Sequence, residues 1–592
     1  MTETRTDPPE DQGIPGPEGH AAVIQTDYEV GQDNIETRLG PLRLDFHNPV
    51  FLVSAAFVVL FVAIALIWPE GSKSTFLSVR DYTKSTFDWF FILSANIFVI
   101  FALILIVTPW GSVRLGGSDA VPDYSYPSWF AMLFAAGMGI GLMFFGVLEP
   151  VYYFGTPWGD QPLSGQLGII DGQVQDAATV EAARQSAMAA TIFHWGLHPW
   201  AIYAIVALAL ALFSYNKGLP LTLRSAFYPL LGERVWGFWG NVIDTLAAFA
   251  TLFGLATSLG IGSTQVASGL TEVFGSGDAE AGTRNFLGFG WGNAEAGANS
   301  SVLLVVIIAV ITLIALVSVI RGLDGGVKRL SEINMVLATL LLLFVFLVGP
   351  TMDILGDFFG GLMAYATNIV PLSNPFGRED TGFLHGWTTF YWAWWISWSP
   401  FVGMFIARVS RGRTVREFVV CVLLIPSVVC VFWMATFGGT AITQVIEQGA
   451  ESAVFQNVIG AYKPEISLFA MLGDLPIASI TSVLAIILVV VFFVTSSDSG
   501  SLVIDTITAG GKVDAPVSQR VFWCIFEGAV AAVLLLGAAG TAGLDSLQAL
   551  VISSGFFFTI VLLVMCWAIV VGLKNERHAM TGNYDKISRP AD

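Results

Sequence analysis

Twelve apolar runs, each of 20 residues or more, set the possible folds of this 592-residue chain. A run of about 20 mostly apolar residues crosses the hydrocarbon core of a bilayer as an α-helix. Charged residues make up only 12% of the chain, about half of the ~25% in an ordinary soluble protein. The chain is therefore predicted to be an all-α, multi-pass membrane protein with 12 transmembrane helices. The predicted spans are 49–68, 88–109, 128–153, 187–213, 236–268, 301–320, 333–352, 386–407, 416–439, 475–500, 518–539 and 547–573.

The positions of Lys and Arg predict how these spans are oriented. If the N-terminus is inside, the short inner loops and adjoining span ends hold thirteen Lys and Arg residues, and the outer loops hold seven. Inner loops of membrane proteins carry the excess of positive charge. Because an even number of spans leaves both ends of the chain on one side, both termini are predicted to be cytoplasmic.

Three segments outside the spans have their own character. Residues 1–48 are acidic and rich in Pro and Gly, a composition that predicts a disordered cytoplasmic tail. Residues 574–592 form a short second tail on the same side. Residues 353–370 mix large apolar side chains with two carboxylates four positions apart, Asp353 and Asp357. This pattern predicts an amphipathic helix on the outer surface.

Alternating glycines interrupt the third predicted span. Gly137, Gly139 and Gly141 follow one another at a spacing of two, and each glycine costs a helix interior roughly 1 kcal/mol. An unwound backbone at membrane depth persists only where it is buried in protein or lines a cavity, and it points to the binding site of a transporter. Close packing of small residues against another helix is the alternative. The spacing of two, rather than four, favours a break.

Aromatic residues crowd the middle of the fourth and eighth spans. Trp394, Trp395 and Trp398 lie three and four positions apart, so these rings share a helix face. Tryptophan is common at membrane interfaces, but these residues lie far from the ends of the span. A permanent cation binds to aromatic faces with about 2 kcal/mol or more when it is desolvated. The clusters therefore predict a site for a small quaternary-ammonium solute.

Two further groups of polar residues have simpler alternatives. His194 and His198 have the i, i+4 spacing of metal ligands, but no third ligand is evident, and a structural role is predicted. Thr495 and Ser496 end an apolar helix with hydroxyl groups. Together with carbonyl groups freed by the broken third span, these hydroxyls could bind sodium, which prefers oxygen ligands. Hydrogen bonding back to their own helix is the alternative. Asp498 is predicted to be a structural or gating carboxylate.

Three segments resemble the signature segments of the betaine–choline–carnitine transporter family. They are Ala135–Gly141, Trp195–Tyr203 and Trp392–Phe401. The similarity covers roughly residues 50 to 575, and the aromatic string that ends at Phe401 is the most specific part.

The resemblance implies an architecture. The family has a LeuT-like fold, in which two peripheral transmembrane helices (here 49–109) precede two inverted five-helix repeats (here 128–352 and 386–573). It also implies a homotrimer in a bacterial inner membrane, which the helix at 353–370 helps to hold together.

The resemblance also implies roles for individual residues. The substrate-binding residues would be Trp195, Trp200, Tyr203, Trp394, Trp395, Trp398, Ala136, Gly137, Gly139 and Gly141. Sodium would be bound by Ala135, Met138, Phe492, Thr495 and Ser496. A second sodium ion would be bound at Thr251 and Phe401, but Leu255 stands where the family has a threonine, so the number of sodium ions stays open. Thr257 or Ser258 could supply the missing oxygen.

The residue at position 141 bears on the substrate. Proton-coupled choline carriers of the family have an aspartate at the last glycine of the motif, and this chain has Gly141. With no carboxylate in the expected box, a zwitterion such as glycine betaine or ectoine is favoured over choline. In sodium-independent exchangers of the family a side chain, such as a cationic one, replaces the sodium ion, and none is apparent here. The resemblance therefore makes sodium-coupled symport by alternating access the leading hypothesis.

Other functions remain as alternatives. Within the family these are sodium-independent exchange of carnitine-like compounds and import of choline. A channel or a membrane sensor belongs to a different class. An enzyme is not expected, because no nucleophile, acid–base pair or metal cluster converges in the spans, and a nucleic-acid partner is not expected either.

Overall fold

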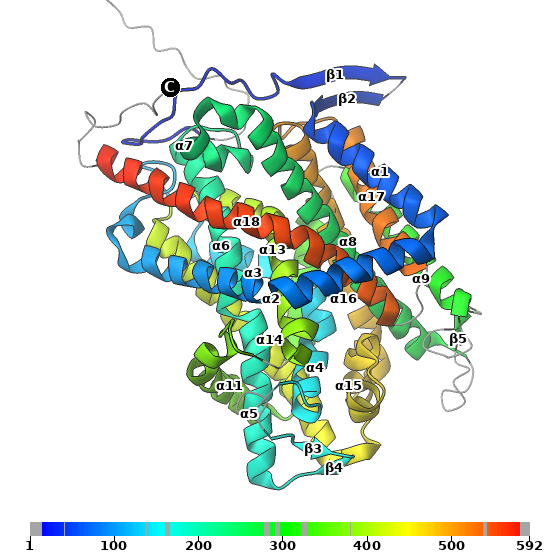
Figure 1. Ribbon diagram of the computed structural model, residues 1–592. Coiled ribbons are helices and arrows are strands. Elements are labelled where there is room, and N and C mark those ends of the chain that lie inside the picture. Colours follow the sequence, from blue (N-terminus) through cyan, green and yellow to red (C-terminus); the bar gives the residue numbers. More distant parts are fainter. Residues whose placement is uncertain are drawn as a thin grey trace, which may run out of the picture.

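A computed structural model of the protein describes residues 15–40, 42–137, 139–159, 166–276, 285–287, 289–290, 297–321, 328–378, 381–536 and 541–580. Helices make up most of this part of the chain (Figure 1). Ten of the described helical segments are long and apolar enough to cross a membrane. Their helices are α1 (Val50–Ile67), α2 (Pro69–Val107), α5 (Ala177–Trp195) continued by α6 (Leu197–Ala211), α8 (Phe238–Phe274), α9 (Gly297–Arg321), α10 (Lys328–Val348), α14 (Val415–Gln448), α16 (Ala478–Thr508), α17 (Val517–Leu536) and α18 (Thr541–Met580).

Two of the twelve predicted spans fall outside these ten segments. The third is divided between α3 (Tyr126–Gly137) and α4 (Ile140–Gly155), each too short to cross a bilayer alone. The eighth is α13 (Thr389–Arg408), in which Trp, Tyr and Ser replace many aliphatic residues. The multi-pass, helical architecture predicted from the sequence is therefore confirmed, with ten spans recognisable by length and apolarity.

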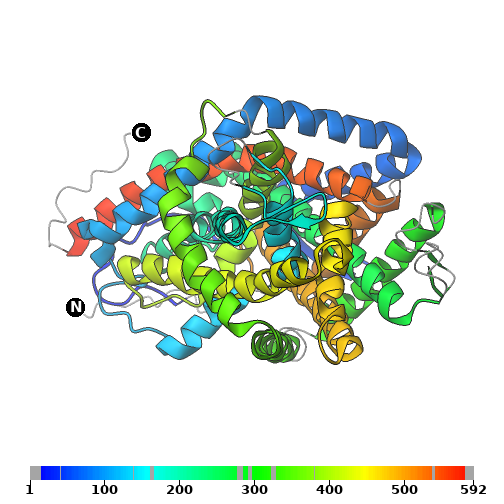
Figure 2. The same cartoon turned by 90° about the horizontal axis from the view of Figure 1, so that it is seen from below.

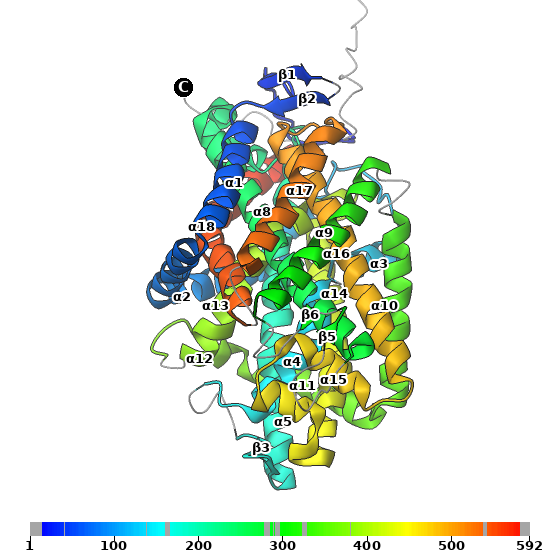
Figure 3. The same ribbon diagram turned by 90° about the vertical axis from the view of Figure 1, so that its right-hand side faces the viewer.

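Burial separates central helices from peripheral ones. The most apolar part of the α5–α6 segment is 94% buried within the protein, whereas that of α1 is 28% buried. The outward side chains of α1 include Leu60 and Ile67, which are 60% and 83% exposed. Seen from below, α2 lies along one edge of the bundle (Figure 2), and α1 and α2 lie on the same side of it in Figure 3. An apolar helix with an exposed apolar face is suited to contact with lipid.

The segment that precedes α1 is ordered, which corrects the prediction of a disordered tail over 1–48 for its described part. Strands β1 (Asn34–Leu39) and β2 (Leu42–His47) pair as an antiparallel hairpin. Asn34 donates a hydrogen bond to the carbonyl of Ala509 (3.0 Å). The hairpin has little core of its own, and it is held by contacts with the helical bundle that composition alone does not reveal.

Two shorter hairpins and several single turns complete the fold. Strands β3 (Ile169–Ile170) and β4 (Gln173–Val174) lie at the end of the molecule opposite β1 and β2 (Figures 1 and 3). Strands β5 (Asn285–Phe286) and β6 (Phe289–Gly290) form the third hairpin. The short helical elements are α7 (Tyr228–Leu231), α12 (Thr381–Phe383), α15 (Ser467–Gly473), η1 (Pro109–Ser112), η2 (Leu212–Asn216), η3 (Arg224–Phe227), η4 (Gly232–Trp236), η6 (Leu384–Thr388), η7 (Gly449–Glu451), η8 (Phe455–Gly460) and η9 (Pro464–Ile466).

The predicted amphipathic segment forms α11 (Thr351–Leu372). Its carboxylates do not both face outward, however. The side chain of Asp357 is only 4% exposed and forms a bidentate ion pair with Arg184 of α5, with Nε–Oδ1 and Nη2–Oδ2 distances of 2.5 and 2.7 Å. The sequence predicted the helix, but it did not predict that the buried Arg184 would pair with the acidic face of this helix and hold it against α5.

Candidate functional site

The third predicted span is interrupted between α3 and α4, as the alternating glycines predict. Helix α3 ends at Gly137, α4 begins at Ile140, and the backbone of Gly139 between them is extended, with φ −165° and ψ −176°. Met138, a predicted sodium ligand, lies outside the described residues. The last four carbonyl groups of α3 lack a partner within their own helix, so the break leaves backbone oxygen atoms available at this depth.

The fourth predicted span is also interrupted, at Gly196 between α5 and α6. Gly196 donates its N–H to the carbonyl of Ile192, and the chain then continues as α6. Pro199 has no N–H to bond to the carbonyl of Trp195 four residues earlier, which breaks the helical ladder here. The interruption brings side chains from both helices, Trp195 and Trp200, to one space.

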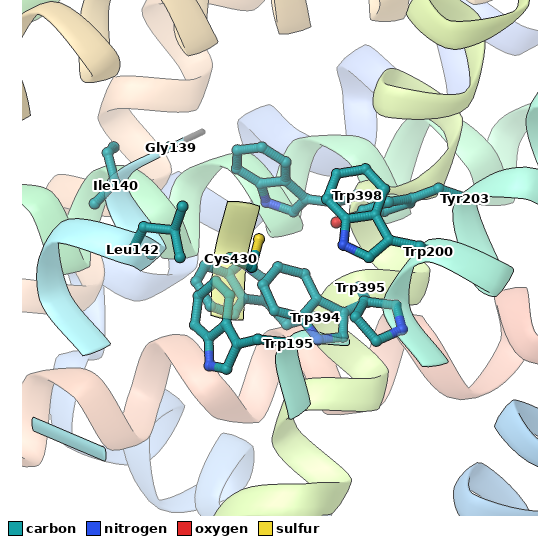
Figure 4. Close-up of a pocket in the computed structure, with 12 residues that line it drawn as sticks. Gly139, Ile140, Leu142, Trp195, Trp200, Tyr203, Trp394, Trp395, Trp398 and Cys430 are labelled. Carbon is teal, nitrogen blue, oxygen red and sulfur yellow. The ribbon is translucent and has the colours of Figure 1, made fainter. Parts of the chain in front are cut away.

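A cavity lies where these two interruptions meet α13. Aromatic rings surround it, as Figure 4 shows. Its described lining consists of Gly139, Ile140, Gly141, Leu142, Trp195, Pro199, Trp200, Tyr203, Trp394, Trp395, Trp398 and Cys430. This lining contains no carboxylate. Apolar, aromatic walls of this kind are typical of a small-molecule site.

The predicted aromatic residues are thus brought together. All six of them line the cavity, together with Gly139 and Gly141. Gly137 ends α3 and is not part of the described lining, and the side chain of Ala136 lies outside the described part of the chain. The sequence analysis missed Cys430 of α14, which carries no recognisable signal among the other residues of its apolar run.

The rings form one connected array. Trp394 and Trp395 stack, with centroids 4.8 Å apart and planes at 16°. Trp195 meets Trp395 edge to face at 5.0 Å, and Tyr203 meets the same ring at 6.2 Å. Trp200 contacts Tyr203 edge to face at 5.4 Å. We name Trp195, Trp200, Tyr203, Trp394, Trp395 and Trp398 the aromatic box.

Hydrogen bonds fix four of the five indole rings of the box. The N–H groups of Trp394, Trp395 and Trp398 donate to Ser258 Oγ (3.0 Å), the carbonyl of His194 (3.0 Å) and the carbonyl of Gly254 (2.9 Å). The fourth, Trp195 Nε1, donates to the carboxylate of Glu149 at 2.8 Å. Because the N–H group of each of these four rings is already bonded to a protein acceptor, the rings present apolar surface to the cavity.

Gly141 is required by close packing. A Cβ atom at this position would lie 2.8 Å from Cη2 of Trp195 and 2.9 Å from Cη2 of Trp394. Real Cβ atoms do not approach other heavy atoms so closely. Any side chain at position 141 would therefore displace two rings of the box.

Glu149 is the site residue that the sequence analysis missed. Its side chain is fully buried in α4, and its Oε1 lies 2.5 Å from Nδ1 of His194. Its Oε2 accepts hydrogen bonds from Trp195 Nε1 and from the hydroxyl of Tyr391 (2.6 Å). A lone carboxylate in an apolar span is itself a signal of function, and Glu149 lies within the predicted span 128–153.

Two statements from the sequence need correction or refinement here. An acid–base pair, Glu149 and His194, does converge within the spans. It is sealed behind the box, because neither residue belongs to the described lining of the cavity. His194 and His198 do not share a ligand: His194 Nε2 contacts Thr388 Oγ1 (3.0 Å), and His198 Nε2 contacts Asn96 Oδ1 (3.1 Å).

The hydroxyl groups proposed to bind sodium lie on α16. The Thr495 hydroxyl donates to the carbonyls of Val491 (2.9 Å) and Phe492 (3.2 Å), so its oxygen lone pairs remain available. Phe492 and Ser496 are buried on the same helix. Gly262 of α8 lies between the helix break and α16. A Cβ atom at this position would lie 3.2 Å from Ile140, the first residue of α4, and 3.5 Å from Val489 of α16.

The region of the expected second sodium site is more apolar than the resemblance implies. Thr251 Oγ1 donates to the carbonyl of Ala247 (2.8 Å), and Leu255 packs against Gly500. Of the two hydroxyls that could compensate, Ser258 already accepts a hydrogen bond, whereas Thr257 only donates and keeps its oxygen lone pairs. Thr257 donates to the carbonyl of Leu547, and Ser258 accepts the N–H of Trp394.

Two buried carboxylates of α16 and α17, Asp498 and Glu527, contact hydroxyl groups. Asp498 accepts a hydrogen bond from Ser318 of α9 (2.5 Å), which agrees with the structural role predicted for it. Glu527 of α17 accepts hydrogen bonds from Ser497 (3.0 Å) and Ser501 (3.1 Å). These bonds join α9, α16 and α17 beside the candidate sodium site.

Comparison with known proteins identifies the family. Residues 49–578 match the model of the betaine/carnitine/choline family of transporters. The chain is 55% identical to a glycine betaine/proline/choline transporter of Vibrio parahaemolyticus, over 96% of this chain and 98% of that protein. A second protein of that species, glycine betaine transporter 1, is 54% identical over 94% of this chain and 98% of its own length. A glycine betaine transporter of Acinetobacter baylyi is 41% identical over 92% of this chain and 76% of its own length. The chain belongs to the betaine/carnitine/choline transporter family.

Proposed function

We propose that the protein imports a zwitterionic quaternary-ammonium solute, such as glycine betaine, by sodium symport and alternating access. The observation that carries the proposal is the aromatic box. Its rings surround a cavity whose described lining has no carboxylate, and their N–H groups point to fixed acceptors behind the rings. Ring faces bind a permanent cation that has no hydrogen to donate. A solute with zero net charge needs no buried counter-ion.

The relatives support this choice of substrate class. Those of Vibrio parahaemolyticus and Acinetobacter baylyi are named for glycine betaine, and one is also named for proline and choline. The absence of a side chain at Gly141 favours a zwitterion over choline, because a carboxylate there would need space that two tryptophan rings occupy. Exchange of carnitine-like compounds without sodium is the main alternative within the family.

We propose one coupled sodium ion, bound by the hydroxyls of Thr495 and Ser496 and by backbone carbonyls near Ala135 and Phe492. The free carbonyls of the broken span and the hydroxyl oxygens of α16 are the donor types that sodium prefers. Sodium bound between these elements would stabilise the arrangement that binds substrate, so the two affinities would be linked reciprocally. The apolar side chain of Leu255 argues against a second ion at Thr251 and Phe401.

The larger architecture remains part of this proposal. Twelve spans would be arranged as two inverted five-helix repeats of the LeuT type, with both termini in the cytoplasm of a bacterium. Three copies would assemble in the inner membrane, with α11 at the interface between them. Spans three and eight would each begin a repeat, and they contribute the broken segment and most of the box tryptophans.

A substrate panel tests the proposed function. The protein would be expressed in cells that lack their own osmolyte carriers, and uptake of radiolabelled glycine betaine would be measured with competing ectoine, proline, choline and carnitine. Saturable, sodium-dependent betaine uptake is expected, with choline as the weaker competitor. Uptake of carnitine that requires preloaded substrate but no sodium would contradict the proposal.

A further inference from the structure

Glu149 is a fully buried carboxylate at the back of the aromatic box. It lies two helical turns beyond Gly141 on α4, so one helix supplies both the close-packed wall of the cavity and this carboxylate. Its contacts reach α5 through Trp195 and α13 through Tyr391. Glu149 therefore connects α4 to α5 and α13, two of the three helices that supply rings to the box, without belonging to the described lining of the cavity.

The partners of Glu149 match an ionised carboxylate. An indole N–H can only donate, and the hydroxyl of Tyr391 has its donor directed at Oε2. If the proton of His194 is assigned to Nδ1, it donates to Oε1, and the Thr388 hydroxyl can then donate to Nε2. The carboxylate of Glu149 then accepts three hydrogen bonds and needs no proton of its own. A buried charge at membrane depth requires such partners.

The ring of Trp195 differs from its neighbours in its hydrogen-bond acceptor. Trp394, Trp395 and Trp398 donate to a neutral hydroxyl or carbonyl oxygen, whereas Trp195 donates to an anion. Hydrogen bonds to an ionised acceptor are roughly twice as strong as neutral ones. An N–H that is drawn towards an anion leaves more electron density on its own ring. The face of that ring then attracts a cation more strongly.

We propose that Glu149 is a positioning residue that orients the Trp195 ring and polarises it for binding the ammonium group of the substrate. This inference rests on the proposed function, because it requires a quaternary ammonium in the box. Glu149 acts through Trp195, and its negative charge contributes a longer-range attraction for the same ammonium group. A carboxylate placed in the cavity would bind a cation directly, but it would occupy the space of the substrate.

The test compares two ligands of the same shape. Glycine betaine and 3,3-dimethylbutyrate differ only in the nitrogen of the ammonium group, which is carbon in the second compound. Binding of each to the purified full-length protein would be measured at saturating sodium from the quenching of tryptophan fluorescence. The variant Glu149→Gln keeps an oxygen acceptor of the same size but removes the charge. Ser258→Ala, which removes the neutral acceptor of Trp394, serves as the matched control.

Glu149→Gln is expected to weaken betaine binding by about tenfold and to leave the binding of 3,3-dimethylbutyrate unchanged or tighter. Ser258→Ala is expected to change both ligands by the same factor. Glu149→Asp keeps the charge at a greater distance and is expected to lie between wild type and Glu149→Gln; it provides the readout if the Gln variant does not fold. An equal loss for both ligands, or no loss for betaine, would overturn the inference. Failure of the wild-type protein to bind betaine would overturn the proposed function first.

Discussion

Trp195 and Trp395, which come from helices 200 positions apart in the sequence, meet edge to face with centroids 5.0 Å apart and planes at 76°. The Trp395 N–H donates to the carbonyl of His194, the residue before Trp195, at 3.0 Å. The two rings are thus joined by direct contact and by the backbone. Any movement of α13 against α5 changes the shape of the box.

Substituting Trp395 tests whether ring faces bind the substrate. Trp395→Leu removes the ring that contacts Trp195, Trp394 and Tyr203, and a desolvated cation–π contact contributes about 2 kcal/mol. The KM for glycine betaine is expected to rise roughly 30-fold, while the amount of protein in the membrane stays normal. An unchanged KM in sodium-driven uptake would contradict the aromatic box.

Adding a methyl group to the glycine motif tests the packing of the cavity wall. Gly141→Ala would force Trp195 and Trp394 apart, whereas a Cβ at Gly139 meets no atom within 4 Å. Overpacking of this kind typically costs 1–3 kcal/mol. The affinity for betaine is expected to fall about tenfold or more in Gly141→Ala and much less in Gly139→Ala. Equal effects of the two substitutions on KM would show that the wall is not tightly packed.

Hydroxyl groups on α16 are expected to set the affinity for sodium. Thr495→Ala removes one proposed oxygen ligand, and Thr495→Ser retains it as the control. The sodium concentration for half-maximal betaine uptake is expected to increase about tenfold in the alanine variant and to stay near the wild-type value in the serine variant. If Thr495→Ala transports with normal sodium dependence, sodium does not bind at this position.

The buried ion pair between Arg184 and Asp357 is expected to stabilise the attachment of α11. Removing one partner of a buried pair leaves an uncompensated charge and costs about 3–5 kcal/mol. Arg184→Met and Asp357→Leu should each lower the melting temperature of the purified protein, and the double variant should be more stable than either. Additive losses in the double variant would mean that the two residues are not coupled.

The docking of the β1–β2 hairpin is expected to depend on pH through His47. Burial, together with the positive charge of nearby Arg224, lowers the pKa of His47 to about 3. Between pH 6.5 and 3 the detached hairpin therefore binds a proton that the docked hairpin does not, so docking weakens as the pH falls through this range. The nearest carboxylate to this imidazole is that of Asp33, whose Oδ2 lies 3.8 Å from His47 Nε2.

Hydrogen exchange of the backbone amides in residues 34–47 measures this effect. Protection of the hairpin is expected to decrease from pH 7 to pH 5 in the wild-type protein. His47→Asn, which cannot be protonated in this range, should show little change over the same interval. A hairpin whose protection follows pH identically in both proteins would exclude His47 as the cause.

The sequence predicted the parts of the molecule that depend on local patterns. The apolar runs predicted most of the long helices, and the alternating glycines predicted the break at 137–140. The spacing of Trp394, Trp395 and Trp398 indicated the shared ring face of α13, and the resemblance to the family supplied Trp195, Trp200 and Tyr203. In each case the residues that carry the signal lie within one or two turns of each other.

Features that depend on distant partners were not predicted. Glu149 contacts His194 at a separation of 45 positions and Tyr391 at 242. Asp357 is paired with Arg184 across 173 positions, and the β1–β2 hairpin is attached to Ala509 across 475. The composition of residues 1–48 predicted a disordered tail, because the groups that hold the hairpin belong to distant parts of the chain.

Uptake into proteoliposomes tests the central claim most directly. Purified protein would be reconstituted in vesicles, and accumulation of radiolabelled glycine betaine would be followed with an inward sodium gradient and, in parallel, with potassium in place of sodium. Transient accumulation above the external concentration is expected with the sodium gradient, and no accumulation with potassium. Equal uptake in the two conditions would contradict sodium-coupled symport.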